Sequence, residues 1–338
     1  MIKSLEYFRA IAIIFIVAGH FFPVTGVEAS NLFELTIQNV IFGGTTLFVF
    51  ISGFLFHHVF YKNFSYGQFL RKKVKVIVLP YLFFSLIPII YYSMKNINAH
   101  LYFDIQVVNY FSLAFKYFIT GSSLQIYWYI PFIMLVFLLS PLHIRFIKVN
   151  FGSKLVVVTI MIVISTFLHR SIENYNVLHN FIYFTPIYLI GIMASIYKSR
   201  IYNFFNGKEY YILALVFSLA FFQAYNGDVG SYHKAPFQYN GVDLMLLQKL
   251  SLSLFFMLWL HNFERTRNKF LEFIAATSFT IYFMHAFLLW VISGFNFKFD
   301  GNWVEYIVLV AFTIMLCSAT AFITKKGFKK RSRYIIGF

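Results

Sequence analysis

The stretch EYFRAIAIIFIVAGH (residues 6–20) has Glu6 and Arg9 near its start and His20 at its end, with no charge among the ten residues between Arg9 and His20. A helix advances about 100° and 1.5 Å per residue, so the eleven steps from Arg9 to His20 make three turns plus roughly 20°. The two side chains therefore share one face, about 16 Å apart along the axis. Glu6 lies three residues before Arg9 on the same stripe, within reach of an ion pair.

The composition of the chain indicates that this helix lies in a membrane. Hydrophobic residues make up 60% of the 338 residues and charged residues only 12%, and the mean hydropathy is +0.72. A water-soluble core cannot hide that much apolar surface, so lipid must cover it. No stretch has the length and charge density of a soluble domain, and we therefore expect one transmembrane domain over residues 1–338, with a basic tail at 325–338.

Ten runs of the sequence are apolar and long enough to cross hydrocarbon as helices, which takes about 20 residues. They lie near residues 5–24, 33–60, 73–94, 126–147, 154–169, 179–198, 209–225, 243–262, 270–293 and 303–325. The predicted fold class is an all-α integral membrane protein, a bundle of about ten transmembrane helices. The segment 105–120 is too short and too polar for a span, and we expect it to lie in the interface or to dip back toward the bundle.

The basic residues predict how the chain is oriented, because Lys and Arg near span ends are retained in the cytoplasm. With the N-terminus inside, 22 of the 28 Lys and Arg residues fall on the cytoplasmic side, whereas eight of the twelve acids fall outside. Both termini are therefore expected to be cytoplasmic. Topology and attraction to anionic membrane lipid account for most of the net charge of +16, so no nucleic-acid partner is expected.

The polar stripe of the first helix has two interpretations on spacing alone. A charge in hydrocarbon costs several kcal/mol unless it faces the bundle interior or a wet cavity. A functional stripe would place Glu6 and Arg9 near the cytoplasmic mouth and His20 deeper, toward the outer side. Alternatively, Arg9 reaches inner-leaflet phosphate and His20 is an interfacial anchor.

Five segments carry a resemblance to a known family. LEYFRAIAIIFIVAGH (5–20) resembles the first-helix signature of the membrane-bound acyltransferase 3 family, in which Arg and His are separated by ten residues and an acid precedes the Arg by three. The other four are similar to later segments of that family and occur in its order. They are GGTTLFVFISGFLF (43–56), FLRKKVKVIVLPY (69–81), YWYIPFIMLVFLLSPL (127–142) and ATSFTIYFMHAFLL (276–289).

The resemblance implies a membrane-embedded O-acyltransferase of the bacterial cell membrane. Such an enzyme transfers an acyl group, most often acetyl from cytoplasmic acetyl-CoA as co-substrate, to a hydroxyl of a cell-surface polysaccharide or lipid-linked sugar. A hydroxyl needs a base to attack a thioester, and histidine suits that work at neutral pH. We therefore predict a catalytic role for His20, as base or as transient acyl carrier, with the base role preferred. Arg9 would hold a CoA phosphate or a carbonyl, or pair with Glu6 to shape the channel.

The basic run RKKVK (71–75) is the predicted CoA-binding site, because CoA carries several phosphate charges. Its four cations are Arg71, Lys72, Lys73 and Lys75. The family commonly has two arginines three residues apart here, whereas this chain pairs Lys72 with Lys75, and lysine lacks the bidentate fork of arginine. The alternative is a purely topological anchor at the head of a span.

Five residues are further candidates for substrate binding, and each also has a structural interpretation. They are Ser52, Trp128, Tyr129, Tyr282 and His285. The structural alternatives are close helix packing at Ser52, an aromatic belt at Trp128 and Tyr129, and a hydrogen-bonded core histidine at His285. The other eight histidines lie near span ends or in loops and receive no role.

Other classes of function fit less well. The chain has no Cys pair, His-Glu-x-x-His motif, glycine-rich phosphate loop or nucleophile elbow, and no metal site is predicted. The main rival is a transporter or flippase of a lipid-linked sugar or small metabolite, with Glu6, Arg9, His20 and His285 as its pathway. No inverted repeat supports it. A third possibility is a non-catalytic membrane subunit of a polysaccharide assembly complex.

Overall fold

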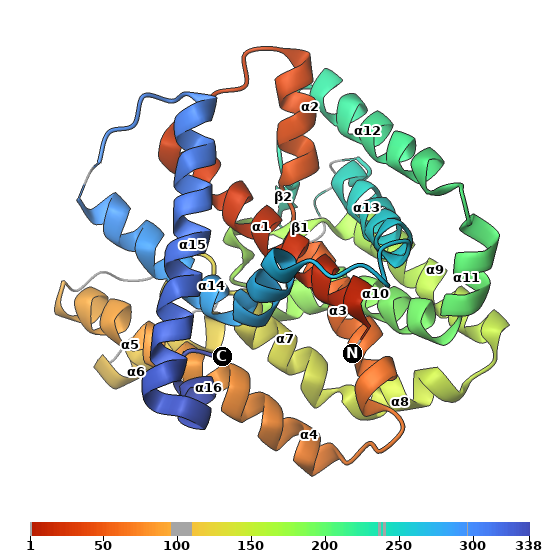
Figure 1. The fold of residues 1–338 in the computed structure, drawn as a ribbon, viewed down its shortest axis with the longest axis horizontal. Helices are drawn as coiled ribbons and strands as arrows, with labels where there is room; N and C mark the ends of the chain where they lie inside the picture. Colours follow the sequence, from red (N-terminus) through yellow and green to blue (C-terminus); the bar gives the residue numbers. More distant parts are fainter. Residues whose placement is uncertain (1, 96–109, 236–237, 239–240, 296) are drawn as a thin grey trace.

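The computed structural model describes residues 2–95, 110–235, 238, 241–295 and 297–338, and most of them are helical (Figure 1). The helices are α1 (Lys3–Thr25), α2 (Leu32–Ile41), α3 (Thr45–Leu55), α4 (Tyr66–Lys73), α5 (Leu79–Met94), α6 (Tyr110–Thr120), α7 (Tyr129–Leu138), α8 (Ser140–Lys148), α9 (Phe151–Leu168), α10 (Val177–Ile196), α11 (Lys198–Phe205), α12 (Glu209–Tyr225), α13 (Leu244–His261), α14 (Lys269–Gly294), α15 (Trp303–Phe328) and α16 (Ser332–Ile335). Short π-helical turns continue α3 (Phe56–Phe60) and α4 (Val74–Val78), and 3-10 turns cover Ile172–Asn174 and Lys329–Arg331. Two strands, β1 (Arg170–Ser171) and β2 (His233–Lys234), pair in parallel.

The helical bundle is confirmed, with a span count slightly below the predicted ten. Within the described residues, eight helical segments are long and apolar enough to cross a membrane. Three of them, Leu32–Phe60, Tyr66–Met94 and Trp303–Ile335, each join two of the helices named above, and the pair α7–α8 makes a ninth if it is one bent span. The run expected at 209–225 is a helix, α12, but it has only 17 residues. Of the expected interfacial segment 105–120, residues 110–120 form α6, and residues 105–109 lie outside the described part of the chain.

Two predicted spans are broken in the structure. The run 33–60 is interrupted at Gly43, whose φ of +76° is left-handed, so α2 ends before it and α3 starts after it. Lys249 of α13 stabilises this break by donating from Nζ to the carbonyls of Asn39 (3.0 Å) and Val40 at the end of α2. The run 126–147 bends by 55° between α7 and α8, where Pro141 enters the second helix.

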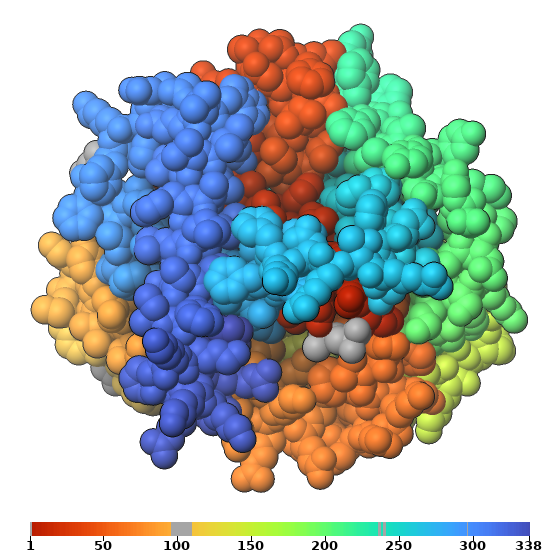
Figure 2. Space-filling model, viewed as in Figure 1, coloured from red at the N-terminus to blue at the C-terminus, as the bar shows by residue number. Residues whose placement is uncertain are grey.

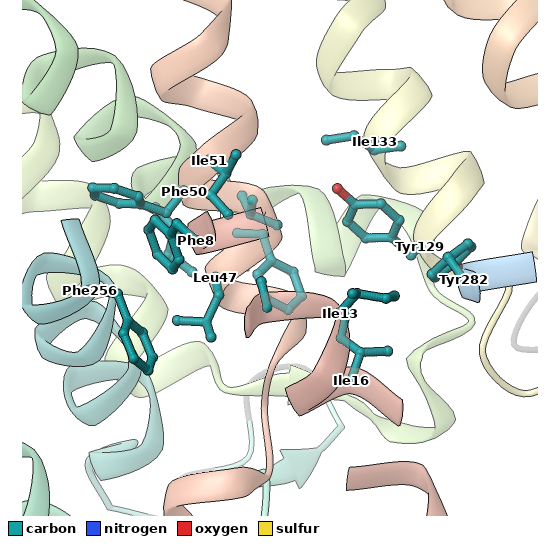
Figure 3. Packing of buried hydrophobic residues seen from close by; sticks show 14 of the residues in the cluster. Phe8, Ile13, Ile16, Leu47, Phe50, Ile51, Tyr129, Ile133, Phe256 and Tyr282 are labelled. Atoms are coloured by element: carbon teal, nitrogen blue, oxygen red, sulfur yellow. The ribbon is translucent and has the colours of Figure 1, made fainter. Parts of the chain in front are cut away.

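Helix α1 runs through the middle of the molecule (Figure 1). On one side Phe8 packs against Phe50 of α3 and Phe256 of α13, with ring centroids 6.1 and 5.7 Å away. Figure 3 shows this cluster, and it shows Tyr129 and Tyr282 on the other side of α1, beyond Ile13 and Ile16. Because α1 is surrounded by protein, its polar side chains are kept away from lipid, as the stripe predicted.

The outer helices carry the lipid-facing apolar surface. Large apolar side chains are exposed along α5, α9, α12 and α15, and in the space-filling view the later helices cover most of α1 (Figure 2). Exposed apolar surface on this scale is typical of a protein solvated by hydrocarbon. The chain is therefore a multi-pass membrane protein.

Both ends of the chain lie at the same end of the bundle as the basic run 71–75. The backbone amide of Lys3 donates to the Glu264 carboxylate (2.8 Å), which ties α1 to the loop between α13 and α14. The C-terminal helix α16 packs on the turn Val74–Val78, and Lys75 Nζ lies 6.0 Å from the ring centroid of Tyr334. This arrangement fits a common side for both termini. Assignment of that side to the cytoplasm stays a prediction.

Helices α3 and α10 approach so closely that only glycine fits at their crossing. A Cβ on Gly53 would lie 2.0 Å from the backbone oxygen of Tyr188, and a Cβ on Gly191 would lie 2.2 Å from that of Phe50. Small residues allow such backbone contact between membrane helices. The structure therefore supports the interpretation of close helix packing at Gly53, the residue that follows Ser52.

We predict that Gly53→Ala destabilises the protein, because the obstructing atoms belong to backbone and cannot rotate away. Overpacking of this kind costs about 3 kcal/mol. Thermal unfolding in detergent should show a clearly lower Tm than wild type. The control is Gly67→Ala on α4, where no atom lies within 4 Å of the added Cβ and alanine favours the helix. Equal Tm values for the two variants would contradict the packing.

Candidate active site

Eight of the predicted site residues line a single cavity of about 270 Å³ between α1, α3, α4, α7 and α14. We call it the lysine cavity. The predicted residues that line it are Arg9, His20, Ser52, Lys72, Lys73, Trp128, Tyr129 and Tyr282. The structure thus joins the basic run to the stripe of α1, although some fifty residues separate them in sequence. Arg9 and His20 do share one face, as their spacing predicted.

A second cavity, of about 550 Å³, lies on the other side of His20. We call it the Arg170 cavity. Its walls come from α1, the Gly43–Thr45 turn, the loop 122–128, the two short strands with their flanking loops, and the end of α14. Five residues line both cavities: Ile16, His20, Thr45, Ile126 and Trp128. Of these five, His20 alone has an ionisable side chain. His20 is therefore the ionisable residue that molecules in both cavities can reach.

The hydrogen bonds of His285 indicate which ring nitrogen of His20 carries the proton. His285 Nδ1 lies 2.7 Å from the carbonyl oxygen of Ile281, which can only accept, so Nδ1 carries the proton. Neutral His285 then has an unprotonated Nε2, which lies 3.4 Å from His20 Nδ1. His20 Nδ1 must therefore be the donor, and His20 Nε2 is left as an acceptor. A histidine in this tautomer can take a proton from a hydroxyl.

His285 is fully buried and lines neither cavity. It was a candidate for substrate binding, but the structure places it behind His20, where it contacts the other histidine instead. Tyr282, one turn earlier on α14, does line the lysine cavity, and its hydroxyl donates to the carbonyl of Ile126 (2.7 Å).

Arg9 and Glu6 do not form the ion pair that their spacing allowed. Among the described residues the carboxylate and guanidinium are not within 4.0 Å of each other, and Arg9 Nε is buried without a hydrogen-bond partner. Glu6 lines neither cavity. A three-residue offset on a helix brings side chains near one another but does not decide their rotamers. Arg9 is thus free to meet a ligand in the lysine cavity.

The basic run splits into two pairs. Lys72 and Lys73 line the lysine cavity, whereas Arg71 and Lys75 are exposed outside it. Lys73 Nζ is surrounded by aromatic rings: the centroids of Phe137, Phe60 and Phe69 lie 4.3, 4.8 and 5.2 Å away. Such cation–π contacts hold the ammonium at the cavity mouth without neutralising it.

Trp128 and Tyr129 are buried inside the bundle rather than placed in an aromatic belt. Trp128 stacks on Phe184 of α10, with centroids 5.6 Å apart, and lines both cavities beside His20. Tyr129 packs edge-on against Tyr282 at 5.8 Å. The belt interpretation is therefore wrong for these two residues. The structure leaves a role in substrate contact open to them.

Arg170 is the site residue that sequence reasoning missed. It was counted only as an outer-loop charge, but it lines the second cavity together with His20. The parallel pairing of β1 with β2 brings it there, with Arg170 opposite His233. A two-residue strand pair between loops that are sixty residues apart leaves no periodic signal in the sequence, so no local pattern could have identified Arg170.

We predict that His20 is protonated at Nδ1 and that His285 maintains this tautomer. Nitrogen-15 NMR of protein labelled at histidine should show two ring-nitrogen shifts for His20 that are typical of the Nδ1-protonated form. These signals are assigned to His20 because they disappear in His20→Gln. In His285→Leu, which removes the imidazole acceptor but keeps the hydrogen bond of His20 to the backbone of Ile16, the shifts should move part of the way toward the Nε2-protonated form that free imidazole favours. A His20 ring already protonated at Nε2 in the wild type would refute the assignment.

Comparison with known proteins agrees with this geometry. The acyltransferase domain model Acyl_transf_3 matches residues 2–322. Proteins described as "Probable poly-beta-1,6-N-acetyl-D-glucosamine export protein" from Staphylococcus aureus strains MRSA252 and MSSA476 are each 24% identical to this chain, over 99% of its length and 95% of theirs. No solved structure matches the chain. The match over nearly the whole chain shows that this protein belongs to the acyltransferase 3 family.

Proposed function

We propose that the protein transfers an acyl group, most simply acetyl, from cytoplasmic acyl-CoA to a hydroxyl of a cell-surface polysaccharide or lipid-linked sugar. One observation carries the proposal: His20 lines both the lysine cavity and the Arg170 cavity. A donor and an acceptor that approach from opposite ends of the bundle can then meet at one imidazole. Family membership independently supports acyl transfer.

The lysine cavity suits the donor. Its lining includes Lys72 and Lys73 of the basic run, which the distribution of charge assigns to the cytoplasmic side. Lys72, Lys73 and Arg9 provide three cations for the CoA phosphates or the thioester carbonyl. The cavity of about 270 Å³ admits the narrow thioester arm more readily than the whole nucleotide, so we expect the nucleotide to remain at the lysines.

The reaction at His20 follows from its tautomer. The acceptor hydroxyl gives its proton to His20 Nε2 while its oxygen attacks the thioester carbonyl. The carbon–sulfur bond breaks, and the CoA sulfur leaves with the proton that the imidazolium returns. The products are an O-acyl ester and free CoA. His285 supports this cycle because its Nε2 accepts the Nδ1 hydrogen of His20, which bears more positive charge once His20 is protonated.

The description of the relatives as probable export proteins gives a second candidate function, export of the glycan itself. Under that proposal the two cavities would be parts of one translocation path. An exporter would move the glycan across sealed vesicles without consuming acyl-CoA. The two functions are therefore separated by whether thioester turnover accompanies glycan modification.

We predict that His20→Ala abolishes thioester turnover. Purified protein in lipid nanodiscs, with its co-purified glycolipid, should release CoA from acetyl-CoA, and the variant should be slower by about 100-fold or more because the base is lost. The control is His261→Ala, since His261 is exposed and lines neither cavity. A His20→Ala protein with wild-type Tm and wild-type turnover would remove the catalytic assignment.

The same preparation separates the two chemical roles of His20. Labelled acetyl-CoA is mixed with protein and the reaction is stopped during the first turnover. The base role predicts label in the glycolipid and none on the protein. Label recovered on His20 would instead establish the carrier role.

A further inference from the structure

Arg170 is a buried cation that the reaction at His20 does not use. Its side chain is 8% exposed, and it lines the Arg170 cavity with His20. We infer that this cavity holds the acceptor by an anionic oxygen group, a phosphate or a carboxylate, bound to the guanidinium of Arg170. The inference rests on the proposed function and specifies the class of acceptor.

The guanidinium is held in place from several directions. The backbone amide of Arg170 donates to the carbonyl of Tyr232 (3.1 Å), which fixes β1 against the next strand. Its Cζ lies 5.2 Å from the ring centroid of Trp128 and 5.5 Å from that of Phe184. Nη1 donates to Ser231 Oγ. A planar cation held against aromatic faces presents its remaining donors in its own plane, where a ligand oxygen can approach.

No carboxylate neutralises Arg170 directly. Within the described residues no Asp or Glu oxygen lies within 4.0 Å of it, and Arg170 Nε is buried without a partner. An acid that interacts with it electrostatically is Asp243, whose two oxygens accept from Tyr183 OH (2.7 Å) and Leu246 N (2.9 Å). Burial of an unpaired cation is costly. A ligand that supplies the missing negative charge would recover part of that cost.

The rest of the cavity has the charge and shape for an anionic sugar. None of the described residues that line it is Asp or Glu, so nothing there repels an anion. Its volume of about 550 Å³ is within the range of small-ligand sites. Its lining includes both aromatic rings and hydroxyl or amide side chains, the groups that stack on a sugar and hydrogen-bond to it. These residues are Tyr92, Ser122, Ser123, Gln125, Trp128, Asn174, Tyr175 and Trp290.

An anion at Arg170 would also orient the acceptor. Arg170 and His20 line the same cavity, and Trp128, whose ring contacts the guanidinium of Arg170, lines it with them. An acceptor anchored by its charged group at Arg170 and stacked on the nearby rings would direct a neutral hydroxyl toward His20. Arg170 would thus be a binding residue that selects the acceptor, and the proton transfer would remain at His20.

Three soluble probes test this inference by calorimetric titration of the protein in nanodiscs. They are N-acetylglucosamine, N-acetylglucosamine 1-phosphate and glucuronic acid. The phosphate resembles the linkage to a lipid carrier, and the acid resembles a charged sugar residue. We expect one of the two anions to bind wild type about tenfold or more tightly than the neutral sugar, and the one that does so identifies the source of the charge.

Variants then test whether Arg170 is the residue that causes this preference for an anion. Arg170→Gln should remove it and Arg170→Lys should retain part of it, whereas Arg145→Gln on the exposed surface of α8 should leave it unchanged. Equal affinity of wild type for all three probes, or an anion preference that survives in folded Arg170→Gln, would overturn the inference. Failure of acyl transfer itself is read separately, from His20-dependent CoA release, so the two proposals fail independently.

Discussion

The contact between His20 Nδ1 and His285 Nε2, at 3.4 Å, is the interaction on which the site depends. Polar groups inside a membrane bundle need partners, and a backbone carbonyl on α14 provides the first one by fixing the proton on His285. The direction of each later hydrogen bond follows from that proton. The result is a histidine on α1 with one nitrogen engaged and the other available, at a point that both cavities reach.

The fold supports the position of His20 because α1, the helix that carries it, lies at the centre of the bundle. Apolar side chains of α1 pack against α3 and α13 (Figure 3). Two residues of its polar stripe, Arg9 and His20, line the lysine cavity. The broken span α2–α3 contributes to both cavities, because the turn that begins at Gly43 delivers Thr45 beside His20. Lys249, which is buried, caps the helix before that turn and so has a structural role, whereas Lys72 and Lys73 line the lysine cavity.

Sequence periodicity predicted much of this arrangement and missed the parts made by long-range contacts. Composition and run length gave the helical bundle, and the eleven-residue interval correctly placed Arg9 and His20 on one face. Helix spacing could not decide the Glu6 rotamer, and the ion pair that the spacing allowed between Glu6 and Arg9 is absent among the described residues. The aromatic-belt interpretation placed Trp128 at an interface because it begins a span, but Trp128 is buried and stacks on Phe184 inside the bundle. The sequence pattern could not identify Arg170, because a pair of two-residue strands, which has no periodic signal, brings it to the site.

In the proposed function, an acyl group passes from one face of the membrane to the other at His20, which lines both cavities. Sealed inside-out membrane vesicles test it directly, because acetyl-CoA does not cross lipid and the cytoplasmic face is then exposed. Labelled acetyl-CoA added outside should acylate glycan enclosed in the lumen, and right-side-out vesicles given the same donor should remain unlabelled. Equal labelling in both orientations would contradict transfer across the membrane. So would inside-out vesicles in which the only labelled glycan can be removed by glycosidase added outside.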